Sequence, residues 1–574
     1  MKKLLCSYVI PFVEECTLDE LETWMIVPPS KDMGDYSLPC FQLAKRMYQT
    51  PKMIAEELKE SIMKESKEAK LVLDHMEVVK GYLNFYLKES WYQNWLLQQC
   101  IFHLSEPMSE GAGKTICIDF SSPNIAKNFH IGHLRTTLIG NSLYKIYEKL
   151  GYHVVGINHL GDWGTQFGKL IVAYKKWGDK EKIEKEGISE LLRLYVLFHE
   201  ELEHKKELME EARLWFLKME QKEKEAIEIW QWFKDISLKE FRKIYEMLSI
   251  SFDSYSGESI YTDSVPALVE QLKAKNLLVE SDGAYVVLME EENMPPCLIK
   301  KSDGTSIYPS RDVAAAIDRK NKYDFEQCLY VTGAEQQLHF RQVFQVVKKM
   351  GYDWWRDLVH VSYGLVSVQG EKLSSRNGTM VFAKDLLEEA IRRIHDIIME
   401  KNPKLKNKDE VAKQVGIGAV IFHDLYHVKV KNVSFSWEQV LNFDGATAPY
   451  IQYTCARANS ILRKNWEECN WVLGDFEQLN SYSKYYTETS TKYLLSVMGT
   501  YWDVIHEAAK RYEPCVIARF AYELAHGFNQ FYQECNIQSA TFDCKQARLL
   551  LTYLVKQTIQ EAMSMLGIEC PEEM

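Results

Sequence analysis

Two histidines, His130 and His133, are spaced so that both can act on one ligand. They lie three residues apart, and apolar residues at helical spacing run from Ile131 to Ile146. A strand-like run, 115–120, comes shortly before them, so the pattern predicts a strand, a turn and a helix N-terminus. The unpaired N–H groups of a first helical turn and the helix dipole favour phosphate. The pair is therefore a candidate anion site, although H-x-x-H at a helix start is explained equally well by capping or core packing when it is taken alone.

A second candidate for phosphate chemistry is the glycine-bounded loop 370–382, GEKLSSRNGTMVF. Lys372 and Arg376 flank Ser374 and Ser375 in a segment with few apolar anchors. This composition suits a mobile loop that closes on phosphate, but an exposed basic hairpin explains the loop equally well by itself. The run GAGKT at 111–115 is not a P-loop, because Met108 stands where the first glycine is needed and the run precedes a strand.

The elements that would position these residues alternate as in an open parallel α/β sheet. Strand-like runs at 115–120, 152–155 and 327–332 are each followed by a loop and a helical pattern. Ligands of such sheets bind outside the carboxyl ends of the strands. The charged segment 175–250 predicts solvated helices without chemistry of their own. Strand-like runs return at 278–300, and a helix is expected to start at Pro309.

Composition limits the class of protein. A chain of 574 residues predicts roughly three to five domains. The 46% of hydrophobic residues include no long uncharged apolar run, so we expect no membrane segment. The 13 cysteines form no C-x-x-C pair, which argues against a zinc knuckle or a disulfide frame and favours a reducing cytoplasm. Residues 1–13 imitate a signal peptide, but Pro11 interrupts the apolar run, so we expect the first element of a folded domain.

The charge balance argues against one kind of nucleic-acid binding. A net charge of −12 does not suit a protein that coats nucleic acid through bulk positive charge, but it leaves RNA binding by local patches open. From residue 386 onward the pattern is almost wholly helical, with aromatic residues at helical spacing. We expect most of these aromatic side chains in the core, while exposed ones would be able to stack on single-stranded bases.

Several of these stretches match one family when they are taken together. The chain resembles the class I aminoacyl-tRNA synthetases, and within that class the arginyl-tRNA synthetases, over essentially its whole length. The HIGH signature lies in SPNIAKNFHIGHLR, and KLSSRNG occupies the place of the KMSKS loop far downstream. Four further stretches are arginyl-like, namely LGDWGTQFG, SGES, IYPSRD and DGATAPYIQYTCAR.

The resemblance implies an α/β fold of several domains. A small α+β N-terminal domain that touches the tRNA elbow would span 1–110. A doubly wound, Rossmann-like parallel-sheet catalytic domain would span 111–385, with a helical insertion at about 175–300. A helical stem at 386–450 would lead to an α-helical anticodon-binding domain at 451–574.

The resemblance also implies a two-step reaction with ATP. L-arginine would be activated to arginyl-adenylate with release of pyrophosphate, and the arginyl group would pass to the 3′-terminal adenosine of tRNA(Arg). In this family activation usually needs bound tRNA. We expect Mg²⁺ to arrive with ATP without a dedicated protein site, and the protein to act as a cytoplasmic monomer with no membrane partner.

The resemblance assigns the catalytic and ATP-binding roles residue by residue. Donors are needed where charge develops on the α-phosphate and on the departing pyrophosphate. The family's positions for catalysis and ATP binding fall on His130, His133, Lys127, Lys372, Gly132, Gly333, Glu335, His339, Ser374 and Arg376. The chain departs from the class at Ser375, where KMSKS has its second lysine, and Lys127 is a candidate for the missing cation.

Arginine recognition calls for carboxylates, because a guanidinium offers five donors in a planar fork. The family's arginine-binding positions fall on Asn124, Glu258, Tyr308, Asp312 and Gln336. Asp312 lies four residues after Tyr308 in a predicted first helical turn, so a ring and a carboxylate can address one ligand. Without the other residues, Asp312 would be interpreted as a partner of the helix dipole.

Three alternatives remain open. One is another HxGH nucleotidyltransferase that joins ATP to a small acid without RNA, although the helical third of the chain argues against it. Another is a synthetase-derived RNA-binding or regulatory protein without catalysis, which the presence of both histidines and the pocket carboxylates disfavours. The third is a synthetase for another amino acid, with lysine and glutamine as nearest competitors.

Overall fold

A four-stranded parallel sheet positions the segment that carries the two histidines. In the computed structural model its strand order is β10–β9–β4–β5, and every neighbouring pair is parallel. The strands are β4 Thr115–Asp119, β5 His153–Ile157, β9 Gln327–Gly333 and β10 Leu358–Tyr363. The apolar run of β4 is buried on both faces, as a parallel strand covered by helices requires. The predicted α/β architecture is therefore confirmed.

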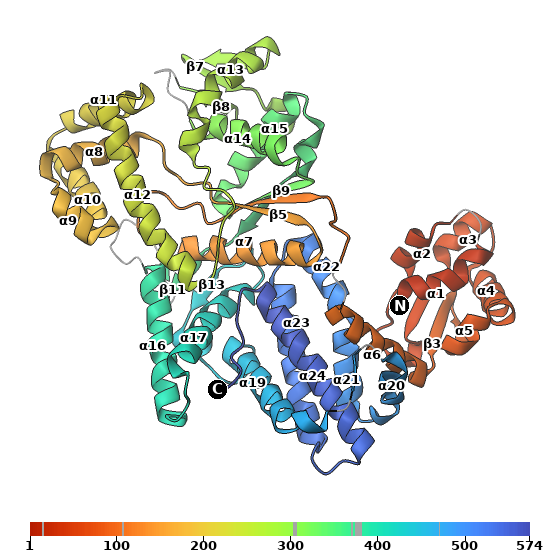
Figure 1. Ribbon diagram of the computed structural model, residues 1–574. Helices are drawn as coiled ribbons and strands as arrows, with labels where there is room; N and C mark the ends of the chain where they lie inside the picture. The colour runs from red at the N-terminus through yellow and green to blue at the C-terminus, as the bar shows by residue number, and fades with distance from the viewer. Residues whose placement is uncertain are drawn as a thin grey trace. The chain divides into compact units, whose positions relative to one another are not determined.

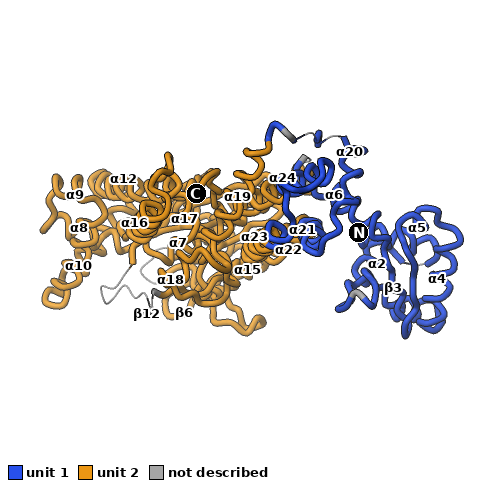
Figure 2. Tube along the Cα trace, turned by 90° about the horizontal axis from the view of Figure 1, so that it is seen from below, with its two compact units in different colours: residues 1–105, 466–499, 530–554 blue, residues 106–465, 500–529, 555–574 orange. Residues whose placement is uncertain are grey.

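The structure describes residues 1–13, 16–105, 108–301, 307–368, 371–372, 381–469, 471–473 and 475–574. These residues form two compact units (Figure 2). Unit 1 comprises residues 1–105, 466–499 and 530–554, and unit 2 comprises residues 106–465, 500–529 and 555–574. Two long helices, α23 Cys515–Glu534 and α24 Phe542–Met565, contribute residues to both units.

Helices cover both faces of the parallel sheet in unit 2. Figure 1 shows α7 (Ile131–Lys149) on one side of the strands and α14 (Tyr308–Tyr323) with α15 (Gln337–Lys349) on the other. A Cβ at Gly140 would lie 2.2 Å from the Phe120 side chain, so this glycine lets α7 approach the end of β4 closely.

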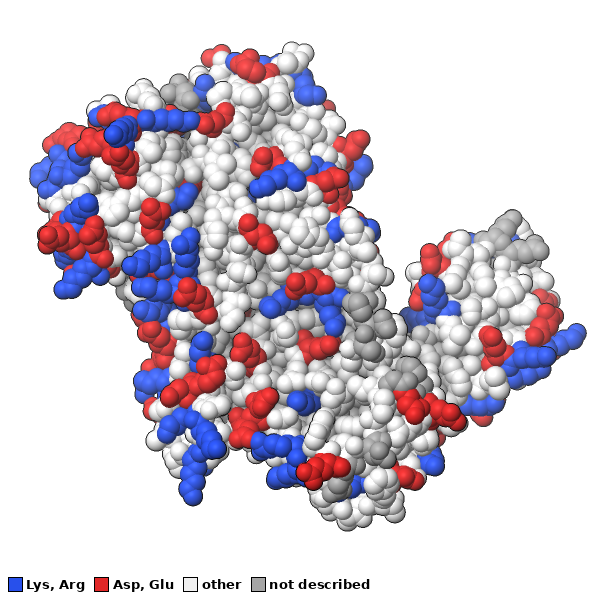
Figure 3. Space-filling view, viewed as in Figure 1, with Lys and Arg blue, Asp and Glu red and all other residues white. Residues whose placement is uncertain are grey.

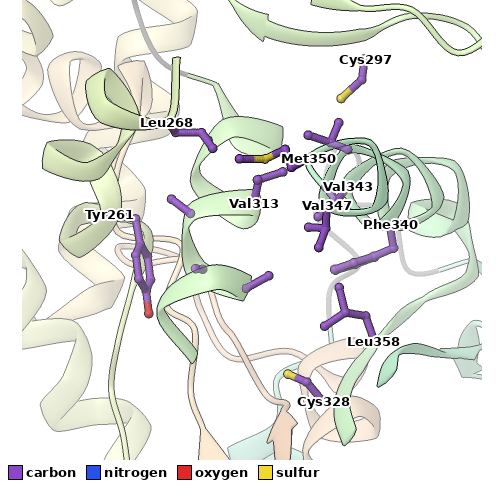
Figure 4. Packing of buried hydrophobic residues seen from close by; sticks show 14 of the residues in the cluster. Tyr261, Leu268, Cys297, Val313, Cys328, Phe340, Val343, Val347, Met350 and Leu358 are labelled. Carbon is purple, nitrogen blue, oxygen red and sulfur yellow. The ribbon is translucent and has the colours of Figure 1, made fainter. Parts of the chain in front are cut away.

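The apolar core of unit 2 fills the space between the sheet and α14 and α15. Figure 4 shows Val313 of α14 between Leu268 on one side and Val343 of α15 on the other. Cys328 of β9 and Leu358 of β10 close the cluster from the sheet. Burial of this cluster fixes α14, whose first turn carries Tyr308 and Asp312.

The segment after β5 is helical, as its charge pattern predicts. Its helices are α8 Thr165–Trp177, α9 Lys180–Glu186, α10 Ile188–His204, α11 Glu207–Glu220 and α12 Lys224–Met247. The 3₁₀ turn η3 (Glu258–Ser264) and α13 (Val265–Ala274) follow. A small antiparallel sheet then forms from β6 Leu278–Ser281, β7 Ala284–Val287 and β8 Cys297–Lys300, where the sequence predicts strands.

The later part of unit 2 is helical with one small exception. Its helices are α16 Ala383–Lys401, α17 Lys408–Leu425, α18 Trp437–Val440, α19 Ala448–Lys464 and α22 Tyr501–Arg511. A three-stranded sheet of β11 Val366–Val368, β12 Glu371–Lys372 and β13 Val433–Phe435 also forms. The sequence pattern missed β13, because three residues are too short to show strand alternation and its partner β11 lies far away in the chain.

The aromatic residues of the C-terminal region divide as expected. Phe520, Phe528 and Phe531 are buried, whereas Tyr453 and Tyr532 keep 44% and 45% of their surface exposed. The prediction that these side chains lie in the core is therefore confirmed for the three phenylalanines, whereas the two tyrosines lie at the surface.

Unit 1 contains a three-stranded antiparallel sheet. Its order is β1–β3–β2, with β1 Tyr36–Pro39, β2 Leu73–Val79 and β3 Tyr82–Leu87. Its helices are α1 Lys2–Val9, α2 Leu18–Trp24, α3 Phe41–Met47, α4 Pro51–Glu65, α5 Lys67–Val72, α6 Glu89–Ser105, α20 Phe476–Ser481 and α21 Thr489–Gly499. The sequence pattern misses β1, which pairs with the distant β3 and is bridged at Ser37 to Ile26.

The surface charge and the hydropathy of the helices bear on whether nucleic acid or a membrane is a partner. On the face in Figure 3, Lys and Arg side chains are interspersed with Asp and Glu. None of the helices among the described residues is long and apolar enough to cross a membrane.

Candidate active site

A cleft of about 660 Å³ opens in unit 2 beside the carboxyl ends of β4 and β9 and the first turn of α7. It brings together residues from six separate stretches of the sequence. The predicted site residues that line it are Asn124, His130, Gly132, His133, Glu258, Tyr308, Asp312, Gly333, Glu335, Gln336 and His339. The cleft lies where a ligand of an open parallel sheet binds.

The turn between β4 and α7 is strained. Ser121, Ser122 and Ala126 have φ angles of 70°, 44° and 61°, the left-handed region that non-glycine residues rarely adopt. Hydrogen bonds hold this backbone: the Thr136 hydroxyl accepts from the Ser121 N–H at 3.3 Å, and the Ser122 hydroxyl donates to Asp119 at 2.8 Å. Strain of this kind is stored at functional sites, and here it aims the chain into α7.

The two histidines form the N-terminal cap of α7. Their rings stack with centroids 3.8 Å apart. The Gly132 N–H donates to His130 Nδ1 at 3.1 Å, and the His130 N–H donates to His133 Nδ1 at 3.3 Å. Because both Nδ1 atoms accept, each neutral ring carries its hydrogen on Nε2. The pair therefore offers two N–H donors at a helix N-terminus.

Burial keeps the histidine pair neutral. Burial, reinforced by the charge of Lys127, lowers the pKa of His130 to about 4. Burial also holds the pKa of His133 well below its ordinary value, and the neighbouring His130 and Lys127 add to this effect. At neutral pH the site therefore presents uncharged donors to an anion.

Asn124 is fixed by close contact with the loop after β5. It forms a parallel bridge with Gly161, whose N–H donates to the Pro123 carbonyl at 3.2 Å. A Cβ at Gly161 would lie 2.2 Å from Asn124 Oδ1, so only glycine permits this approach. The glycine of the LGDWG stretch therefore sets the position of Asn124.

Asp312 lies between two histidines at the start of α14. His339 Nε2 lies 2.6 Å from Asp312 Oδ2, and His159 Nε2 lies 3.6 Å from Asp312 Oδ1. Burial acts to raise the pKa of Asp312, but the two histidines outweigh it and hold this pKa below its ordinary value. Asp312 is therefore a carboxylate at neutral pH.

Glu258 supplies the second carboxylate of the cleft. Its Oε2 accepts from the Arg311 guanidinium at 2.9 Å. Burial raises the pKa of Glu258 to about 7, although the charge of Arg311 opposes the shift. Glu258 therefore changes charge near neutral pH, unlike Asp312.

A fully buried aspartate supports Glu258 from behind. Asp162 accepts from the Ser259 N–H and hydroxyl at 2.8 Å each, and from Lys234 at 2.6 Å. A Cβ at Gly257 would lie 2.6 Å from the Asp162 carboxylate. The residues on both sides of Glu258, Gly257 and Ser259, therefore pack against Asp162.

The C-terminal end of the predicted loop 370–382 lies against the residues around His130. Phe382 bridges to His130, the Ile131 N–H donates to the Val381 carbonyl at 3.2 Å, and the Ala383 N–H donates to the Phe129 carbonyl at 2.9 Å. Two stretches some 250 residues apart thereby meet at the start of α7.

The individual residues of this loop are mostly outside the described part of the chain. The backbone of Lys372, in β12, pairs with Ser367 of β11, while Ser374, Ser375 and Arg376 lie outside the described residues. Lys127 does not line the cleft, although its charge acts on both histidine rings. The roles given to these residues stay predictions.

The sequence pattern missed several lining residues, among them Asp119, His159 and Arg135. Asp119 ends β4, and His159 lies two residues after the end of β5. The rule that ligands bind at the carboxyl ends of parallel strands would therefore have found both. Arg135 is buried and donates to the carbonyls of Leu365 and Lys429 at 3.3 and 3.0 Å. Nothing local in the sequence predicts that role, because both partners lie more than 200 residues away.

Three family models match the chain in consecutive order. The family described as Arginyl tRNA synthetase N terminal domain matches residues 8–87, and tRNA synthetases class I (R), catalytic domain, matches residues 97–437. The DALR anticodon binding domain matches residues 451–574.

Two arginine–tRNA ligases align with this chain over nearly the full length of both proteins. The arginine–tRNA ligase of Alkaliphilus metalliredigens is 46% identical over 560 residues, which cover 97% of this chain and 96% of that protein. The arginine–tRNA ligase of Clostridioides difficile is 47% identical over 564 residues, which cover 98% and 97%.

Solved structures share the fold. The arginyl-tRNA synthetase of Thermus thermophilus superposes with a TM-score of 0.82 at 23% identity and covers 100% of both chains. The enzyme of Plasmodium falciparum gives a TM-score of 0.79 at 24% identity and covers 100% of this chain and 99% of its own.

Proposed function

The chain belongs to the arginyl-tRNA synthetases, and we propose on that basis that it is an arginine–tRNA ligase. It activates L-arginine with ATP to arginyl-adenylate and releases pyrophosphate. It then transfers the arginyl group to the 3′-terminal adenosine of tRNA(Arg), where the 2′-hydroxyl attacks the carbonyl carbon and AMP leaves.

One observation carries the proposal: a single cleft holds neutral N–H donors at one helix N-terminus and, on neighbouring elements, the carboxylates of Asp312 and Glu258. The first set suits a phosphate and the second suits a guanidinium. A cleft that binds both can join arginine to the α-phosphate of ATP. The alternative of a small-acid nucleotidyltransferase leaves the anticodon-binding domain match without a purpose.

The histidines act on the phosphate. When the arginine carboxylate attacks the α-phosphorus in line, negative charge spreads over the equatorial oxygens. His130 and His133 donate to those oxygens through Nε2–H, and because both rings are fixed by backbone N–H groups they need no reorganisation. Lys372 and Lys127 supply the positive charge for the departing pyrophosphate, with Lys127 in place of the lysine absent at Ser375.

Arginine and ATP occupy adjoining parts of the cleft. Asp312, Glu258 and Tyr308 hold the guanidinium side chain, while Asn124 and Gln336 orient the reacting end of arginine. The turn η5 (Ala334–Gln336), with Gly333 and Glu335, contacts the ATP ribose, and Mg²⁺ arrives with the nucleotide. Ser374 and Arg376 are assigned to ATP binding by the resemblance.

The remaining regions serve tRNA. Residues 451–574 bind the anticodon, 1–110 bind the elbow, and 386–450 form the stem between the catalytic and anticodon regions. We further propose that the protein works in the cytoplasm as a monomer.

The test is aminoacylation by the full chain with radiolabelled arginine, ATP, Mg²⁺ and total tRNA. We expect arginine to be esterified, and His133→Ala to lower adenylate formation by about a hundredfold, the scale for losing one transition-state donor. His204→Ala is the control, because His204 is exposed at the end of α10 outside the cleft. Unchanged kinetics for His133→Ala, or charging of another amino acid, would refute the proposal.

A further inference from the structure

His159 lines the cleft, and no step of the proposed reaction assigns it a role. It lies two residues beyond the end of β5 and lines the same cavity as Asp312 and Tyr308. Its side chain is only 11% exposed. A polar ring so placed must either support the fold or meet the ligand.

One nitrogen of this ring is committed to the backbone. Nδ1 lies 2.7 Å from the Ser256 carbonyl oxygen. A carbonyl oxygen only accepts, so Nδ1 carries the hydrogen, and the neutral ring has a lone pair on Nε2. The backbone N–H of the same residue donates to the Ser122 hydroxyl at 3.2 Å, which fixes the chain beneath the ring.

The other nitrogen faces Asp312. Nε2 is 3.6 Å from Asp312 Oδ1, which is beyond hydrogen-bonding distance, and no other described protein group hydrogen-bonds it. His339 occupies the opposite oxygen, Oδ2, at 2.6 Å. Asp312 Oδ1 and His159 Nε2 are therefore two neighbouring acceptors on the same side of the carboxylate.

A guanidinium suits such a pair. It carries five N–H donors in one plane and no acceptor, so one group can donate to both atoms at once. An ammonium is a compact point charge without that planar fork. The two acceptors therefore favour arginine over lysine.

Three of the four histidines that line the cleft, His130, His133 and His159, have complementary roles. His130 and His133 accept backbone N–H groups at Nδ1 and turn donors toward the phosphate. His159 donates at Nδ1 and turns an acceptor toward the arginine pocket. The backbone partner of each ring decides which function its Nε2 performs.

We propose, on the basis of the proposed arginine–tRNA ligase function, that His159 is a specificity-determining residue. In its neutral form it accepts a guanidinium N–H of the substrate at Nε2, beside Asp312 Oδ1. In its protonated form it becomes a donor to Asp312 and a cation that repels the substrate.

The surroundings of the ring make this exchange sensitive to pH. The charged or titratable groups around it are Asp312 and Arg319 on α14, Asp119 on β4, Glu258 and Tyr261 on η3, and His339 on α15 beyond Asp312. Burial acts to lower the pKa of His159, but the Asp312 and Asp119 carboxylates outweigh it and raise this pKa above its ordinary value. Arginine binding should therefore weaken as pH falls toward the acid side of neutrality.

Two substitutions separate a ligand contact from a structural role. A glutamine amide reaches about as far as Nε2 and can still accept a guanidinium N–H there, but it does not titrate. An asparagine amide reaches about as far as Nδ1, so it keeps a donor to the Ser256 carbonyl and loses the acceptor in the cleft. The matched control is His204→Gln, on the exposed end of α10.

Steady-state aminoacylation is measured for the full chain at pH 8 and pH 6, with arginine and ATP varied separately. We expect His159→Asn to raise the arginine KM by about tenfold or more, the scale for one hydrogen bond with a charged partner, with the ATP KM within about twofold. His159→Gln should recover most of that loss and show a smaller rise in arginine KM between pH 8 and pH 6 than the wild type.

The proposal is overturned if both variants lose arginine affinity equally, if the arginine and ATP constants change together, or if His159→Gln keeps the wild-type pH profile. Should His159→Asn fail to fold, the pH profile of His159→Gln still decides. Failure of the wild type to charge tRNA with arginine would instead refute the proposed function itself, so the two failures are distinguishable.

Discussion

Replacement of Asp312 by asparagine isolates the charge that the cleft offers to arginine. The asparagine side chain has the same shape, and its carbonyl oxygen can still accept from His339 Nε2, which lies 2.6 Å from Asp312 Oδ2 in the structure. The substitution therefore removes the negative charge while the His339 contact is kept.

The expected magnitude follows from the hydrogen bond to a charged partner. Such a bond contributes about 1.5–3 kcal/mol, which corresponds to a rise in the arginine KM of between about 10-fold and about 140-fold. Asp312 lies at the start of α14, whereas we propose that ATP binds at the α7 and η5 turns, so the ATP KM should change by less than about threefold.

The assay is steady-state aminoacylation with arginine and ATP varied in turn. Asp324→Asn is the matched control, because Asp324 caps the other end of α14 and its side chain is 92% exposed. Equal changes in both Michaelis constants would show that Asp312 is not an arginine ligand, and an unchanged arginine KM would refute the electrostatic argument.

Three further predictions concern the neighbours of this pocket. Gly161→Ala should raise the arginine KM by about tenfold or more, because its Cβ would meet Asn124 Oδ1 at 2.2 Å; an unchanged KM in the aminoacylation assay would contradict this. Glu258 has a pKa raised to about 7 by burial, so it loses its charge as pH falls below 7, and the resulting rise in arginine KM should become shallower in Glu258→Gln. Lys127→Met should slow adenylate formation about tenfold or more without a change in arginine KM, measured by pyrophosphate exchange with tRNA present; an equal rate would leave no cation role for Lys127.

Much of the fold was predictable because it rests on local periodicity. The apolar runs around β4 and β9 and the helical spacing after His130 predict buried parallel strands and α7 directly. The strands β1, β10 and β13 were missed; β1 and β13 are short, and each pairs with a partner distant in sequence. Pairing of that kind leaves no periodic pattern in the strand itself.

The site was predictable in its residue types but not in its hydrogen bonding. The positions of His133 and Asp312 follow from the resemblance, and the cleft contains both. The hydrogen positions on His130 and His159 depend on which backbone group each Nδ1 meets, and that is set by turns formed from separate stretches. The partners of Arg135 are likewise distant carbonyls, which no residue pattern encodes.

The support beneath Glu258 shows the same limit. The LGDWG stretch suggests only that glycines let the backbone approach a ligand. In the structure Asp162 of that stretch is fully buried and holds Ser259, next to Glu258. A charged side chain with no exposure is visible only once the fold is known.

A competition between amino acids in one reaction tests most directly whether the chain esterifies arginine to tRNA. The full chain is incubated with ATP, Mg²⁺, total tRNA and all twenty amino acids, and the amino acid esterified to tRNA is identified by mass after hydrolysis. We expect only arginine to be esterified to tRNA, because the donors of the cleft match ATP and its carboxylates match a guanidinium. Esterified lysine or glutamine, or tRNA that stays uncharged, would contradict it.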